Sequence, residues 1–167
     1  MYDQLTENDL QQMREELVYR RITLRPQLLE EVKTARAFGD LSENFEYKAA
    51  KREKNQNESR IRYLENMIRT AKIVRDNSTA DQVGMFDRVT VWFEEDEEED
   101  VFQIVTTVKE DALQNRISNV SPAGKALLGH RVGETVTVQV NEQYSYPLTI
   151  RAIEKGEDDG SIPISSY

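Results

Sequence analysis

The sequence predicts an α+β protein in two parts, a long antiparallel helical hairpin followed by a small domain built on an antiparallel sheet. Apolar residues recur at helical spacing through the first 75 residues. Turn-forming polar residues at 76–81 end that pattern, and β-branched or aromatic runs of strand length follow them. With 167 residues, 38% of them apolar and 32% charged, the chain has room for two small soluble domains.

The first predicted helix begins after Thr6, a suitable N-cap, and Asp9 places a negative charge in its first turn. Pro26 removes one backbone hydrogen bond, so we expect one long helix with a kink near this residue. The apolar positions of this helix are Leu10, Met13, Leu17, Leu24, Leu28, Val32 and Ala35.

The second predicted helix carries a heptad seam, because its inward positions alternate steps of three and four residues. A buried asparagine in such a seam usually fixes the register of the two helices, and we assign that role to Asn57. The seam positions are Tyr47, Ala50, Lys54, Asn57, Ile61, Leu64, Ile68 and Ala71.

The short connection around Gly39 requires the two helices to lie antiparallel. Arms of roughly 28 to 30 residues would each reach about 40 to 45 Å. Asp40 and Glu43 lie at the connection, where two carboxylates could hold a divalent metal ion. Their spacing is also that of a capping box with Asp40 as the N-cap, so the residues alone leave both roles open.

Charged residues are distributed unevenly between the two parts of the chain. Residues 1–75 contain 15 Lys and Arg against 13 Asp and Glu, whereas residues 76–167 contain 7 against 18. Within the first part, residues 48–75 contain nine basic and three acidic side chains. This stretch could attract a phosphate backbone, or it could be a solvated helix face.

The second domain is predicted to contain four strands, at 89–93, 101–105, 136–140 and 148–153. Residues 121–129 indicate a loop that opens a short helix, which Gly129 ends. The acidic run 94–100 joins two strands and is typical of a solvated hairpin loop. Exclusion of nucleic acid and attraction of a basic partner surface are the alternatives for this run.

No motif of a self-contained enzyme occurs in the sequence. His130, the only histidine, has no metal-ligand partner nearby in sequence and is expected to be a surface or hydrogen-bonded residue and not a catalytic one. The absence of cysteine excludes thiolate zinc sites and disulfides and suits a reducing compartment, so we expect a cytoplasmic protein. The first residues lack a signal peptide pattern and no apolar run approaches about 20 residues, so neither export nor a membrane is indicated.

Residues 35–51 resemble the signature of the bacterial transcript-cleavage factors, the GreA/GreB family, in the pattern A-R-x-x-G-D-L-x-E-N-x-E-Y-x-A-A-K/R. Residues 117–122, followed by Leu127, Leu128, Gly129 and the segment 132–134, are similar to the C-terminal domain of that family. Gly129 after the leucine pair favours the GreA branch. The resemblance extends from about residue 6 to residue 153.

This resemblance implies a coiled coil at residues 1–75, a linker at 76–83 and an FKBP-like domain at 84–155 that docks on bacterial RNA polymerase. The coiled coil would enter the secondary channel, where Asp40 and Glu43 help to hold the second Mg²⁺ of the polymerase active centre. The polymerase itself would then hydrolyse the backtracked RNA, so the chain is a stimulating factor with no tightly bound cofactor and no small-molecule substrate.

Further residues are implied by the same resemblance: Arg36, Lys51 and Arg52 as contacts to the RNA 3′ end, and Ser121 and Pro122 as polymerase-docking residues. Residues 156–167 extend beyond the usual end of the family, and their charge and glycine content predict a flexible tail. The alternatives are a channel-binding paralogue that inhibits or regulates polymerase and a coiled-coil adaptor without a cleavage role. A free-standing nuclease would need more ligands than two carboxylates.

Overall fold

The computed structural model describes residues 3–39 and 44–166, which form two compact units. The helical unit comprises Leu10–Ala71, and the second unit combines Asp3–Asp9 with the chain from Lys72 onward. We expected the first domain to span residues 1–75. The structure shortens it at both ends, because strand β1 (Gln4–Leu5) pairs in parallel with strand β2 (Lys72–Ile73) within the second unit.

The first arm is continuous but changes its helical geometry once. It consists of helix α1 (Glu7–Tyr19), the π-helical segment η1 (Arg20–Leu24) and helix α2 (Arg25–Arg36). Pro26 lies in the first turn of α2, where it has no N–H for a regular α-helical bond. The disturbance predicted at Pro26 therefore takes the form of one wider turn just before it, closed by a bond from Arg25 N to Arg20 O.

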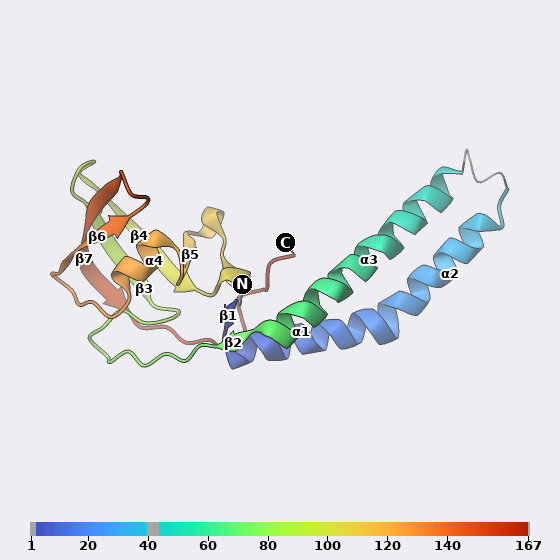
Figure 1. The fold of residues 1–167 in the computed structure, drawn as a ribbon, viewed down its shortest axis with the longest axis horizontal. Coiled ribbons are helices and arrows are strands. Elements are labelled where there is room, and N and C mark those ends of the chain that lie inside the picture. The colour runs from blue at the N-terminus through green and yellow to red at the C-terminus, as the bar shows by residue number, and fades with distance from the viewer. Residues whose placement is uncertain (1–2, 40–43, 167) are drawn as a thin grey trace. The chain divides into compact units, whose positions relative to one another are not determined.

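Helix α3 (Phe45–Thr70) runs antiparallel to the first arm (Figure 1). Every position of the predicted heptad seam is buried or half-buried, which confirms the seam. The apolar positions predicted for the first arm are likewise buried or half-buried. Ile61 and Leu64 are among the most buried side chains, at 2% and 0% exposed. The two helices are thus held by an apolar seam, as the spacing of the sequence predicts.

A polar layer, formed by Glu16, Arg20, Asn57 and Arg60, crosses this seam. Arg60 is buried and donates to both carboxylate oxygens of Glu16, at 2.8 and 3.1 Å. Arg20 donates to the same carboxylate at 2.8 Å and to Asn57 Oδ1 at 3.0 Å. Asn57 Nδ2 in turn donates to the backbone oxygen of Arg20 at 3.3 Å, within the π-helical segment. Asn57 therefore joins the two arms at one register, as predicted.

The carboxyl group of Glu16 is ionised within this layer. Burial alone would raise its pKa, but the hydrogen bonds from Arg60 and Arg20 have the larger combined effect and lower the pKa below its ordinary value. A second bidentate pair follows towards the tip, where Arg25 donates to Glu58 at 2.8 and 2.9 Å. These charge-assisted bonds add directional contacts to the seam.

The second unit contains a five-stranded sheet in the order β5-β4-β3-β7-β6. All four predicted strands are present, whereas the short strand β5 was not predicted. Its pairing with β4 is parallel, so the prediction of a wholly antiparallel sheet is wrong at this edge. The strands are β3 (Arg88–Phe93), β4 (Glu98–Val105), β5 (Arg116–Ser118), β6 (Thr135–Gln139) and β7 (Ser145–Glu154).

The core of this unit lies beneath helix α4 (Pro122–Leu127), which contacts the sheet (Figure 1). Leu127 and the inward residues of β3 and β7 are fully buried. Gly129 ends the helix as predicted and has φ +82°, a conformation that favours glycine. Two short 3₁₀ turns, Thr107–Lys109 and Ala112–Gln114, precede β5. The α+β class is confirmed.

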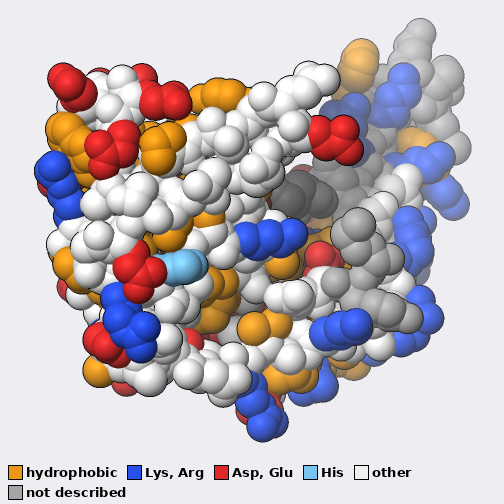
Figure 2. All heavy atoms as spheres, turned by 60° about the vertical axis from the view of Figure 1, so that its left-hand side comes forward, with side chains coloured by type: hydrophobic (Ala, Val, Ile, Leu, Met, Phe, Trp, Pro, Cys, Tyr) orange, Lys and Arg blue, Asp and Glu red, His pale blue; other side chains and the backbone are white. Residues whose placement is uncertain are grey.

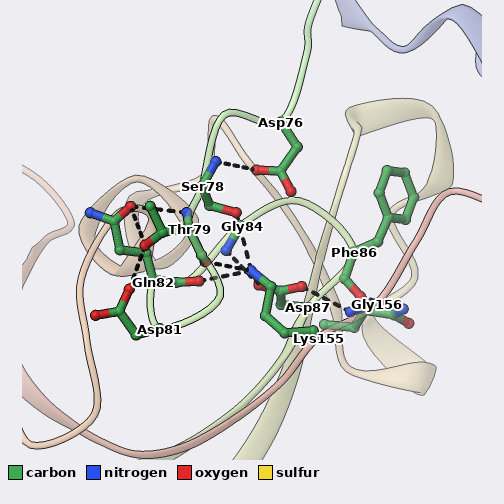
Figure 3. Close-up of polar contacts among 11 residues, drawn as sticks. Asp76, Ser78, Thr79, Asp81, Gln82, Gly84, Phe86, Asp87, Lys155 and Gly156 are labelled. Atoms are coloured by element: carbon green, nitrogen blue, oxygen red, sulfur yellow. Dashed lines mark hydrogen bonds and ion pairs between the residues drawn. The ribbon is translucent and has the colours of Figure 1, made fainter.

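The predicted linker, residues 76–83, belongs to the second unit and is held there in part by Lys155 (Figure 3). Lys155 Nζ contacts the buried carboxylate of Asp87 at 2.6 Å and the backbone oxygens of Thr79 and Gln82 at 3.3 and 2.9 Å. The backbone N–H of Gly84 donates to the same carboxylate at 2.7 Å. The segment has no regular secondary structure, yet its course is determined by these bonds.

The segment after residue 155 is packed, in contrast to the flexible tail that composition predicts. Ile162 is buried in the core of the unit, and Ser165 N donates to Val108 O at 2.7 Å. Lys109, whose side chain is 0% exposed, pairs with Asp9 and with Asp158, each at 2.9 Å. The tail prediction is wrong because its acidic residue meets a buried cation that is distant in sequence.

Replacement of Lys109 by methionine should destabilise the second unit, since it keeps the length of the side chain but leaves Asp9 buried without a cation. Loss of one partner of a buried ion pair typically costs about 3 to 5 kcal/mol. Urea unfolding followed by circular dichroism measures this loss. The control is Lys125→Met, which removes the same charge from an exposed position on α4. Equal stability of the two variants would contradict the role assigned to Lys109.

Candidate functional site at the hairpin tip

The first arm ends at a turn that glycine makes possible. Helix α2 ends at Arg36, and the N–H of Ala37 bonds to carbonyl oxygens of the preceding turn. Gly39 then adopts φ +128°, which a residue with a Cβ atom rarely adopts. The chain thereby leaves the helix within three residues, as the position of Gly39 in the sequence predicts.

Asn44 connects the ends of the two helices. Its Oδ1 accepts a bond from Tyr47 N at 3.0 Å and so caps α3. Its Nδ2 donates at 2.7 Å to Ala35 O, one of the last carbonyls of α2, which lack partners within their own helix. One side chain thus serves both the start of one helix and the end of the other.

A second contact across the tip joins Arg36 to Tyr47. The guanidinium carbon lies 5.4 Å from the centre of the tyrosine ring, and Arg36 Nη2 donates to Tyr47 Oη at 3.2 Å. This hydrogen bond lowers the pKa of the Tyr47 phenol below its ordinary value. Arg36, predicted as an RNA contact, is therefore exposed but held over an aromatic ring of the opposite helix.

Asp40 and Glu43, the predicted metal-handling pair, lie outside the described residues. The structure nevertheless decides the capping interpretation, because α3 begins at Phe45 and its N-cap is Asn44. A capping box with Asp40 as the cap of this helix is therefore wrong. Asparagine is among the strongest N-cap residues, so Asn44 directly before the helical run was the signal for this role.

The two basic residues predicted to contact RNA, Lys51 and Arg52, are exposed on α3. For neither of them is an ion pair found in the part of the chain that the structure describes. Their charges are available to a ligand, in contrast to Arg60 of the same helix, which is buried against Glu16. The basic stretch predicted from composition therefore contains both structural and exposed cations.

An open groove of about 550 Å³ lies between α2 and α3 near the tip. Its walls are apolar at Ala35 and Ala50, and Phe38 at its edge is 75% exposed. Sequence reasoning missed this groove, because its residues belong to two helices and share no motif. Its acidic lining residues are Glu30, Glu31 and Glu46.

The two predicted docking residues lie at the start of α4 in the second unit. Ser121 is the N-cap, since its Oγ accepts a bond from Gly124 N at 3.1 Å and donates to Ser118 O at 2.6 Å. Pro122 occupies the first helical turn and is exposed. Ser121 therefore has a structural role that is sufficient to explain its presence, and Pro122 is accessible.

Residues 3–39 and 44–166 contain no cluster of three or more His, Asp or Glu side chains that could hold a metal ion. Within the same ranges, no helix has the length and apolar character needed to span a bilayer.

Comparison with known proteins adds to this geometry. The model of the N-terminal domain of the GreA/GreB transcription elongation factors matches residues 3–73, and that of their C-terminal domain matches residues 77–155. Transcription elongation factor GreA of Bacillus subtilis is 43% identical over 135 residues, covering 81% of this chain and 86% of that protein. GreA of Geobacillus kaustophilus is 45% identical over 136 residues, with 81% and 86% covered.

Among solved structures, the transcription factor Gfh1 is 25% identical to this chain. The match covers 92% of this chain and 97% of Gfh1, with a TM-score of 0.45.

Replacement of Asn44 should loosen the tip, because one side chain caps α3 and also bonds to α2. Asn44→Ala removes both bonds, and loss of an N-cap alone costs about 1 kcal/mol. Asn44→Asp keeps the cap but loses the donor to Ala35 O, so its effect should be smaller. Hydrogen exchange at the Tyr47 amide measures the first bond: it should be faster in Asn44→Ala and nearly unchanged in Asn44→Asp. Equal exchange in all three proteins would contradict the capping geometry.

Proposed function

Since the chain belongs to the GreA/GreB family of transcription elongation factors, we propose that it binds bacterial RNA polymerase and stimulates hydrolysis of backtracked RNA through its hairpin tip. The observation that carries the proposal is the capping of α3 by Asn44, so the start of that helix does not require a carboxylate of the tip motif as its cap. Both carboxylates belong to the tip motif that the sequence shares with the family.

The donor set at the tip fits a magnesium ion. Mg²⁺ prefers oxygen ligands and is commonly bound by one or two carboxylates together with substrate phosphates and water. Asp40 and Glu43 would supply the two carboxylates, and the polymerase and its RNA would supply the remaining ligands. In a two-metal site the ion contributes activation of water and stabilisation of the leaving oxygen. No cofactor bound tightly to the isolated chain is required.

Other residues of the helical unit support the two helix ends between which this pair lies in the sequence. The polar layer fixes the register of the two arms, and Asn44 and Arg36 connect their ends, close in sequence to the two carboxylates. Lys51 and Arg52, exposed on α3, are suited to attract the phosphates of the displaced RNA 3′ segment. The chain thus contributes ligands and positioning, while the polymerase carries out the hydrolysis, so the chain is not itself the enzyme.

Docking on polymerase is assigned to the second unit, in the region of Pro122 and the adjoining Ser121. Pro122 is exposed in the first turn of α4, and the cap formed by Ser121 fixes the direction of that helix. Because polymerase is the partner, the chain would act in the cytoplasm.

Neutral isosteres of Asp40 and Glu43 distinguish a role in metal binding from a role in folding. Asp40→Asn and Glu43→Gln keep size and shape, and α3 keeps its own cap, so thermal unfolding should be unchanged. Each variant should lose about tenfold or more of the cleavage stimulation of a stalled, backtracked complex, because a neutral amide is a poor magnesium ligand. Glu30→Gln, an exposed charge on α2, is the matched control and should retain activity. Full stimulation by both tip isosteres would exclude the metal role.

The exposed cations of α3 should affect RNA contact without affecting the tip. Lys51→Ala combined with Arg52→Ala should reduce crosslinking to the RNA 3′ segment and raise the factor concentration for half-maximal cleavage several-fold. The control replaces Arg62 and Arg69, two exposed cations further along the same helix. If the control pair had the same effect, the contribution would be overall charge and not a contact at the tip.

A further inference from the structure

The acidic run 94–100 contains two kinds of carboxylate. Three of its members bond to side chains of the same unit: Glu94 with Thr149 at 2.5 Å, Glu99 with Arg151 at 3.0 Å and Asp100 with Asn115 at 2.9 Å. Glu95 and Asp96 are exposed, and no ion pair is found for either within the described residues. The run is therefore more than a uniformly solvated loop: three of its carboxylates bond within the unit, and the other four, at 95–98, are exposed.

Glu95 and Asp96 form one wall of a small cavity of about 100 Å³, which we term the aromatic slot. The slot lies where the β3–β4 turn approaches the start of β7. In the upper left of the view in Figure 2, acidic side chains lie beside hydrophobic ones. The residues of the slot are Phe93, Glu95, Asp96, Tyr144, Tyr146 and Pro147.

The rings of the slot support one another. Phe93 and Tyr146 are stacked, with centroids 6.0 Å apart and an interplanar angle of 21°, and Tyr144 lies 6.0 Å from Tyr146. Phe102 packs edge-on against Phe93 at 6.2 Å. Burial, with Tyr144 nearby, raises the pKa of the Tyr146 phenol, so this ring is neutral at physiological pH. The slot is thus lined by rings that pack on one another and by two carboxylates.

This combination specifies the chemistry of a ligand. Aromatic faces attract cations, and carboxylates pair with them. The apolar rings also suit the methylene stem of a lysine or arginine, whose charged end then reaches the carboxylates. Pockets for drug-sized ligands occupy about 300 to 1,000 Å³, so a cavity of 100 Å³ suits a single side chain.

We infer that the aromatic slot binds one lysine or arginine side chain of a basic segment on a protein partner. The charge of the domain supports this choice, because residues 76–167 contain 7 basic against 18 acidic side chains and so attract basic surfaces and repel nucleic acid. The identification of that partner as RNA polymerase rests on the proposed function. The expectation that the slot binds a cationic side chain rests only on the residues that line the slot.

Competition binding to polymerase tests the inference with the full chain. Glu95→Gln and Tyr144→Leu should each weaken binding about five- to tenfold, because each removes one of the groups that would hold the cation. The matched control is Glu97→Gln, which removes one charge from the same turn outside the slot. Equal weakening by Glu95→Gln and Glu97→Gln would show that only the overall charge matters and would overturn the inference. Unchanged binding of both slot variants would also overturn it.

A second measurement keeps the inference distinct from the proposed function. The full chain is titrated with N-acetyl-arginine amide and with N-acetyl-lysine amide, and the aromatic resonances of Tyr144 and Tyr146 are followed by NMR. They should shift with the cationic probes and remain in place with N-acetyl-glutamine amide. If the wild-type chain failed to bind polymerase but the rings shifted, the proposed function would fail and the slot would stand. If the resonances of both rings stayed in place with both cationic probes, binding of a cationic side chain in the slot would be excluded.

Discussion

The register of the two paired arms is the constraint on which the helical unit depends. A shift along the seam would separate Arg60 from both oxygens of Glu16 and Asn57 from the backbone of Arg20, leaving buried polar groups without partners. It would also separate Asn44 from Ala35 O. An apolar seam alone tolerates such shifts, because one heptad resembles the next. The polar contacts therefore define where the arms end, and with them the position from which the chain leaves for residues 40–43.

Ion pairs with at least one buried partner have a comparable role in the second unit, where they hold segments without regular secondary structure. Lys155 holds residues 76–83 beside Asp87, and Lys109 joins Asp9 to Asp158. Loss of a partner is costly at Lys109, which is itself buried, and at Asp87, the buried partner of the exposed Lys155. The exposed acidic run behaves differently, because some of its carboxylates stabilise the sheet and two face the aromatic slot. Neighbouring acidic residues of the run 94–100 thus have different structural roles.

Local patterns predicted much of this structure, and distant partners explain what they missed. The heptad seam, the strands and the turn at Gly39 follow from spacing and backbone preference, and the tip motif identified the family. The π-helical turn before Pro26 was not predicted, because the proline itself indicates only a kink. The bond from Asn44 to Ala35 O was missed because it joins residues of opposite arms. The spacing of Asp40 and Glu43 also allowed a capping box, and the start of α3 at Phe45 identifies Asn44 as the cap instead. The packing of residues 156–166 depends on Lys109, nearly 50 residues earlier. The metal-binding role of Asp40 and Glu43 rests on the tip motif and on the preference of Mg²⁺ for carboxylate oxygens.

The claim that Asp40 and Glu43 help to hold a magnesium ion is tested most directly by the Mg²⁺ dependence of transcript cleavage. A stalled, backtracked polymerase complex is titrated with Mg²⁺ alone, with the wild-type chain, and with the variant that carries Asp40→Asn and Glu43→Gln together. Two added carboxylates should lower the Mg²⁺ concentration for half-maximal cleavage, and the double variant should restore the value of polymerase alone. A wild-type chain that raised the maximal rate but left this concentration unchanged would contradict the account.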